Sequence, residues 1–166
     1  MQTALARIIG AIGSADFPAV TAHALSRALD FELAAIILHA GTARPETLHD
    51  DLTRVGCSEG MRNYLGTTHR MNPMLRAART EAVRASDYAT RPAAKLACAQ
   101  DCLIWTDDEE LGFRTRGWPE RQEEIGLYMP APGGIVELSL YRDRRRTPAP
   151  GAHLAVQGRV GQHHQG

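Results

Sequence analysis

The last third of this sequence contains two segments whose pattern requires paired β-strands. Residues 123–129 read EEIGLYM, residues 135–142 read IVELSLYR, and PAPGG joins them. Such runs, joined by a linker with Pro and Gly, are typical of a β-hairpin. The second run alternates between two sets of side chains, Val136, Leu138, Leu140 and Arg142 on one side and Ile135, Glu137, Ser139 and Tyr141 on the other. We expect the Val/Leu/Leu side to face the core of an antiparallel sheet.

The first thirty residues predict two helices. Apolar residues in 2–12 fall at helical spacing, namely Leu5, Ile8, Ile9 and Ile12, and Gly13 ends the segment. Asp16 offers an N-cap and Pro18 suits a first turn, so a second helix should run to about Leu29. Residues 31–40 read FELAAIILHA, which predicts a central strand buried on both faces.

The middle of the chain mixes helical and turn signals. ETLHDDL is ambiguous, while 59–70 favours a helix. Asn72–Pro73 is a strong helix start, and that helix should run to about Val83. RASDYATRP reads as a connection, AAKLACAQDCL as a helix, and GFRTRG as an edge strand.

This order of elements predicts an α+β domain, in which helices pack against a twisted antiparallel sheet. Sensor domains of the GAF and PAS kind have this architecture, by analogy. We assign residues 1–142 to this domain. Residues 143–166 are rich in Pro, Gly and His without a sustained period, so we expect a disordered tail.

Composition excludes several classes of protein. The chain has 19 basic and 19 acidic residues, whereas a free-standing nucleic-acid binder is usually basic. No apolar stretch approaches the length of about 18 residues that a membrane span needs. Three cysteines, at positions 57, 98 and 102, suggest a reducing cytoplasm rather than a disulfide framework.

The segment GWPERQEE, residues 117–124, contains the strongest candidates for catalytic or ligand-binding residues. Its carboxylates, Glu120, Glu123 and Glu124, would support a small enzyme if burial separated their pKa values. No nucleophile motif accompanies them, and most carboxylates are exposed, so structural or pocket-rim positions are favoured. Only one of Glu123 and Glu124 can face inward from a strand, and Glu124 is the candidate. Trp118 either walls a ligand pocket or fills the core where the chain enters the hairpin.

The cysteine pair offers another hypothesis, a metal- or redox-responsive switch. Cys98 and Cys102 are four residues apart and would share one helical face. Structural zinc sites usually add a second pair, which this sequence lacks. Burial as two small core residues is therefore favoured over a switch, and we assign no metal site and no cofactor.

Several motifs occur in an order that resembles a known family. MRNYLGTTHR leads into MNPMLRAAR, then VRASDYA, then LGFRTRGWPERQEEIGLYMPAPGGIVELSLYR. Over about residues 15–142 this order is similar to the GAF-like N-terminal sensory region of LuxR-family transcriptional regulators. The resemblance implies a non-catalytic domain that senses a small molecule, commonly as a homodimer. The helices within 2–29 would supply the dimer surface.

The sequence departs from this family at its end. Family members continue into a helix-turn-helix domain, whereas this sequence continues through RRRTPAPGAHLAVQG. We therefore expect a truncated member or a stand-alone module, without sequence-specific DNA binding by this chain alone. The resemblance supplies no catalytic residue and no ligand contact.

A ligand pocket can nonetheless be placed from strand alternation and motif position. A sheet with helices against it and a broad apolar face can hold such a pocket. The residues predicted to lie near it are Ile36, Leu38, Tyr64, Trp118, Glu124, Leu138 and Leu140.

Overall fold

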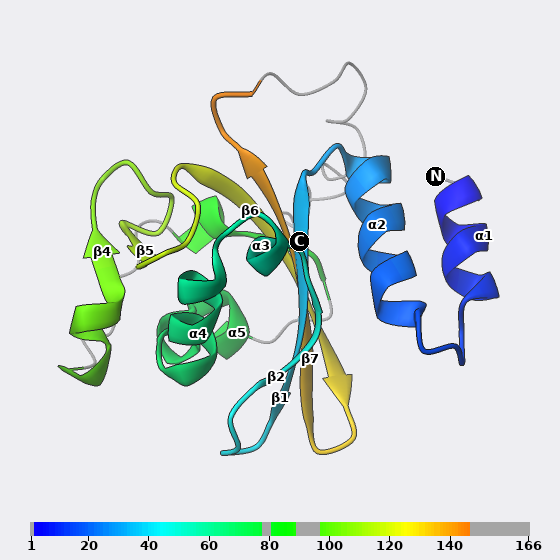
Figure 1. The fold of residues 1–166 in the computed structure, drawn as a ribbon, viewed down its shortest axis with the longest axis horizontal. Helices are drawn as coiled ribbons and strands as arrows, with labels where there is room; N and C mark the ends of the chain where they lie inside the picture. The colour runs from blue at the N-terminus through cyan, green and yellow to red at the C-terminus, as the bar shows by residue number, and fades with distance from the viewer. Residues whose placement is uncertain (1, 78–80, 89–96, 147–166) are drawn as a thin grey trace, which may run out of the picture.

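A computed structural model describes residues 2–77, 81–88 and 97–146 of the chain. Figure 1 shows a central sheet seen nearly edge-on, with α1 and α2 on one side and α3, α4 and α5 on the other. All pairings in the five-stranded sheet are antiparallel, in the order β2-β1-β7-β6-β3. The predicted fold class, an antiparallel sheet flanked by helices as in GAF and PAS domains, is confirmed.

The predicted hairpin is the centre of this sheet. β6 (Gln122–Ala131) pairs with β7 (Gly134–Asp143) along its whole length, so each strand is longer than predicted. The turn narrows to Pro132 and Gly133, and Gly133 adopts a φ of 78°, which favours glycine. β1 (Leu33–Ala40) pairs with the other side of β7, as expected of a central strand.

Both faces of the sheet are buried, by different layers. On one face, Leu138 and Leu140 pack with Ile36 and with Ala22 of α2 (Phe17–Leu29), which confirms the core-facing side of β7. On the other, Tyr141 packs with Ile37 and with residues of the helices that follow β2. Glu137 and Ser139, also on this second face, are completely buried. The polar side of β7 therefore faces protein as well.

The N-terminal helices follow the prediction. α1 spans Gln2–Gly10, and α2 begins directly after Asp16 with Pro18 in its first turn. The Asp16 side chain makes no capping hydrogen bond, so only its position was predicted correctly.

The ambiguous segment ETLHD forms the edge strand β2 (Glu46–Asp50), and α3 (Asp51–Arg54) follows at once. Asp50 caps this short helix, because its side chain accepts a hydrogen bond of 3.0 Å from the backbone N–H of Thr53. α4 (Ser58–Gly66) and a 3₁₀ turn, η1 (Thr68–Met71), then cover the region predicted as one helix.

The start of α5 (Pro73–Ala77) is confirmed, since Asn72 Oδ1 accepts a hydrogen bond of 2.9 Å from the backbone N–H of Met74. Its predicted end at Val83 is wrong. Val83 and Arg84 form β3, which pairs with β6 at the sheet edge, so strand pairing outweighs the helical pattern there.

The segment before the hairpin forms a separate lobe. β4 (Leu103–Trp105) pairs with β5 (Phe113–Thr115) in a two-stranded sheet, so GFRTRG is a strand of this lobe rather than an edge of the main sheet. The predicted helix over 93–103 is present only as a 3₁₀ helix, η3 (Ala97–Cys102), and residues 93–96 lie outside the described part. The connection predicted after Val83 contains a 3₁₀ turn, η2 (Ala85–Tyr88).

β7 extends to Asp143, one residue into the predicted tail, and Arg146 pairs with Asp30 and Glu32. Residues 147–166 lie outside the described part, so a disordered tail stays a prediction. In the part of the chain that the structure describes, no helix combines the length and the hydropathy that a membrane span requires.

Candidate functional site

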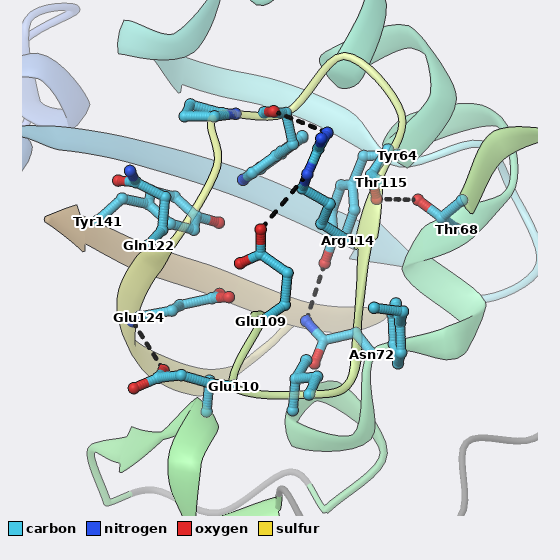
Figure 2. A pocket seen from close by; sticks show the side chains of 15 residues that line it. Tyr64, Thr68, Asn72, Glu109, Glu110, Arg114, Thr115, Gln122, Glu124 and Tyr141 are labelled. Carbon is cyan, nitrogen blue, oxygen red and sulfur yellow. Dashed lines mark hydrogen bonds and ion pairs between the residues drawn. The ribbon is translucent and has the colours of Figure 1, made fainter. Parts of the chain in front are cut away.

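A cavity of about 80 Å³ lies between the second face of the sheet and the β4–β5 lobe. Figure 2 shows side chains from α4, η1, β5, β6 and β7 converging on it. Its volume holds several water molecules or a small ligand. Aromatic and charged groups line it together, which is the usual make-up of a site that orients a ligand.

Tyr64 enters the cavity wall from α4 and is held by buried hydrogen bonds. Its hydroxyl donates to the carboxylate of Glu137, at 2.9 Å to Oε1 and 2.8 Å to Oε2. Asn72 Nδ2 in turn donates to the Tyr64 hydroxyl at 3.0 Å (Figure 2). Glu137 also lies 2.6 Å from Nε2 of His39 and accepts a hydrogen bond of 3.1 Å from Ser139. The network fixes the phenol ring before any ligand arrives.

Trp118 forms the aromatic part of the wall. Its ring centroid lies 5.3 Å from that of Tyr64 and 5.7 Å from that of Tyr141, in tilted and edge-on arrangements. Aromatic pairs prefer such geometries, so the three rings support one another. The backbone at Gly117, directly before Trp118, lies against the backbone of α4 at Gly60. The approach is so close that an added Cβ at Gly60 would lie 2.6 Å from the Gly117 carbonyl carbon.

Glu124 lies on β6 at the cavity wall. Burial raises its pKa to about 8, and the nearby Glu137 carboxylate adds to the shift. At neutral pH this shift favours the protonated carboxyl, which is a hydrogen-bond donor. Its backbone N–H donates to Glu110 Oε2 at 3.4 Å, and burial also raises the pKa of Glu110 (Figure 2).

The lobe adds a largely buried ion pair, Arg114 with Glu109, to the opposite wall of the cavity. Arg114 Nε lies 3.3 Å from Glu109 Oε1, and the Arg114 side chain also bonds to exposed Glu120 at 2.7 Å. Thr115 and Thr68 share a hydrogen bond of 2.7 Å, which links β5 to η1. The cavity thus offers a guanidinium, carboxyl groups and hydroxyls to a polar ligand.

The raised pKa of Glu124 predicts a pH-dependent stability. The folded chain keeps the Glu124 proton up to about pH 8, whereas the unfolded chain loses it near its ordinary pKa of 4.5. The free energy of unfolding should therefore fall as pH rises through this window. Glu124→Gln should match the wild type at pH 4 and be the more stable protein at pH 9, as measured by urea denaturation. Equal stability of the two proteins at both pH values would contradict the assignment.

The structure places three of the seven predicted pocket residues at the cavity and the other four on the opposite face of the sheet. Tyr64, Trp118 and Glu124 meet at the cavity, although they come from separate parts of the chain. Ile36, Leu138 and Leu140 lie in the core cluster beneath α2, on the other face of the sheet. Leu38, two residues beyond Ile36 on β1, falls on that same face by alternation. These four do not line the cavity, because the apolar side of the sheet is packed tightly by α2.

The remaining candidates lie elsewhere. Glu123 pairs with Arg142, and Glu120 is exposed beside Arg114, so neither lines the cavity. Cys102 Sγ donates to Asn63 Oδ1 at 3.6 Å. The side chain of Cys98 lies outside the described residues, so the switch hypothesis stays a prediction.

Sequence reasoning missed several groups of the cavity. Asn72 was recognised only as a helix cap, yet it also bonds to Tyr64 and Tyr128. Glu109 lies outside the predicted elements and Arg114 lies in the predicted strand GFRTRG, and nothing local in the sequence signals that the two side chains form an ion pair.

Comparison with known proteins gives one informative likeness. No protein-family model matches the chain, and no curated protein matches it. The crystal structure of the VqsR LBD (ligand-binding) domain from Pseudomonas aeruginosa is similar, with a TM-score of 0.51 and 14% sequence identity. The likeness covers 87% of this chain and 80% of that one. At this identity it shows a shared fold.

Proposed function

We propose that this chain is a non-catalytic sensory domain of a LuxR-type regulator that binds a small molecule in the cavity between the sheet and the β4–β5 lobe. One observation carries the proposal: Tyr64, Trp118 and Glu124 converge on a cavity that is also lined by the Arg114–Glu109 ion pair. The order of motifs along the sequence and the fold shared with a ligand-binding domain support it.

The cavity indicates the chemistry of the ligand. Its volume of about 80 Å³ suits a compact molecule, and a longer one would require the lobe to move away from the sheet. Trp118 and Tyr64 favour a flat or apolar part, while Glu124 and Arg114 favour polar atoms. A ligand that binds better when the lobe is closed would shift the domain toward that state.

The two tryptophans allow a direct test of binding. Trp118 lines the cavity, whereas Trp105 lies on β4 with 48% of its surface exposed. In a screen of a small-molecule library, a cavity ligand should change the fluorescence of Trp105→Phe, whose remaining tryptophan is Trp118. The same compound should leave the emission of Trp118→Phe nearly unchanged. Hits that act equally on both variants, or only on Trp118→Phe, would contradict binding at the cavity.

We propose that the domain works in the cytoplasm as a homodimer formed through its first helix. Leu5, Ile9 and Ile12 follow one helical face and are 58%, 58% and 67% exposed. These side chains lie on or directly after α1, whose other side packs on α2. An exposed apolar stripe of this kind marks an interaction surface, and a second copy of the chain offers the same stripe.

A charge on this stripe should separate the dimer without unfolding the domain. Leu5→Glu with Ile9→Glu is expected to weaken dimerisation at least about tenfold, since a carboxylate is costly in an apolar interface. Val55→Glu is the matched control, because Val55 is 49% exposed and directly follows α3 rather than lying on α1. Light scattering after size exclusion gives the mass. A wild-type monomer, or a double variant that stays dimeric, would contradict this arrangement.

A small enzyme is the second candidate, and one observation favours it. Glu124 is a carboxyl with a raised pKa in the same cavity as Trp118, as a general acid would be. Among the described residues, however, the lining contains no Cys, His or Ser, which leaves carboxylates such as Glu110 as the partner groups for acid–base work. Turnover of a bound compound that is lost in Glu124→Gln would support the enzyme, whereas binding without turnover supports the sensor.

A further inference from the structure

Three metal-binding side chains meet at the edge of the sheet, away from the cavity. His23 comes from α2, His49 from the edge strand β2, and Asp51 from the first position of α3. Asp51 Oδ1 lies 3.3 Å from His49 Nε2 and 3.7 Å from His23 Nε2. One ligand atom from each residue lies within 4.8 Å of the other two.

These separations suit a shared ion. Ligand atoms bonded at about 2.0–2.1 Å to a tetrahedral Zn²⁺ lie roughly 3.3 Å from one another. Two imidazoles and a carboxylate also form a donor set that divalent first-row transition metals accept. We propose that His23, His49 and Asp51 bind one divalent transition-metal ion of the Zn²⁺ class.

The buried members of the cluster are prepared as ligands. His49 Nε2 is fully buried, and its contact with Asp51 Oδ1 at 3.3 Å does not have the geometry of a regular hydrogen bond. A buried ring nitrogen with only such a weak contact gains from a better partner, and a metal ion would supply one. Asp51 Oδ2 accepts a hydrogen bond of 3.1 Å from the backbone N–H of Ala34, which fixes the carboxylate and leaves Oδ1 toward the histidines.

One cation already approaches the same oxygen. Arg54 Nη2 lies 3.0 Å from Asp51 Oδ1, but 67% of the Arg54 side chain is exposed. An exposed arginine can swing into solvent at little cost, so Arg54 competes with the ion without blocking it. Removal of Arg54 should therefore tighten metal binding.

The cluster also has an open side. A surface groove of about 710 Å³ is lined by His23 and Asp51 together with Arg7, Arg27 and Arg54. A three-ligand site with such an opening can keep water or an anion as its further ligand. The ion would link α2 to β2 and α3. It would thereby stabilise the position of α2, the helix against which α1 packs. This site is independent of the proposed cavity ligand.

The test uses Zn²⁺ and the full chain, stripped with chelator and titrated in competition with a chromophoric zinc indicator. We expect one ion per chain and a dissociation constant of about micromolar or tighter. His23→Ala should weaken it at least about tenfold. This substitution should not unfold the protein, because the His23 side chain is 59% exposed. His49→Gln should have a similar effect, and Arg54→Ala should tighten binding several-fold.

The control removes the other histidine pair near the end of the chain. His163→Ala with His164→Ala should leave the affinity unchanged, since the proposed ligands are His23, His49 and Asp51. Absence of stoichiometric zinc would overturn the proposal. So would unchanged affinity in His23→Ala, or zinc that is lost from the double tail variant while His23→Ala keeps it.

Discussion

Replacing Glu137 with alanine is expected to lower the free energy of unfolding by about 3–5 kcal/mol, as is usual when one partner of a buried polar network is removed. Glu137 is completely buried and bonds to Tyr64, His39 and Ser139. Its loss would leave three polar groups without their acceptor and open a cavity in the sheet face. Urea denaturation monitored by far-UV circular dichroism gives the value.

Glu137→Gln distinguishes the loss of the hydrogen-bond network from the loss of side-chain volume. The amide fills the same space but can no longer accept from every partner, so we expect a smaller loss of about 1–3 kcal/mol. A loss below about 1 kcal/mol in Glu137→Ala would show that the network does not hold the sheet to α4.

Gly60→Ala should have the second largest effect, a destabilisation of about 3 kcal/mol, because it overpacks a contact between backbones. An added Cβ would lie 2.6 Å from both the carbonyl carbon and oxygen of Gly117 and 2.8 Å from the nitrogen of Trp118. The chain would have to separate from α4 there, and Trp118 would leave the cavity wall.

Gly66→Ala is the matched control, since Gly66 lies in the same helix and an added Cβ there meets nothing within 4 Å. Alanine is the better helix former by up to about 1 kcal/mol, so this variant should be unchanged or more stable. A destabilised Gly60→Ala beside an unchanged or stabilised Gly66→Ala would identify the close approach of the two backbones at Gly60. Similar stability of the two variants would contradict it.

Local pattern was enough to predict the framework of the fold. The hairpin, the central strand and both N-terminal helices each follow from alternation or helical spacing within a short segment. The lobe from Ala97 to Thr115 was predicted only in part. GFRTRG was correctly predicted as a strand, but the predicted helix is a 3₁₀ helix where the structure describes it, and β4 was missed because a three-residue strand leaves no period to read. At Val83, a helical pattern yielded to strand pairing with β6.

The candidate site was predicted only in part, for a physical reason. Alternation identified the apolar side of β7, and the pocket was expected against it, at Leu138 and Leu140. Apolar side chains pack tightly against α2, whereas the polar side holds the cavity. Contacts such as Tyr64 to Glu137, separated by 73 residues, arise only when the sheet is assembled.

Native mass spectrometry of the purified full chain tests the central claim most directly. We predict an added small-molecule mass that denaturation releases, present in the wild type and in Trp105→Phe and reduced or absent in Trp118→Ala. A metal adduct is distinguished by its removal with chelator. If the protein binds no small molecule, even when incubated with the hits of the fluorescence screen, or if Trp118→Ala keeps the same added mass, the cavity is not a ligand site.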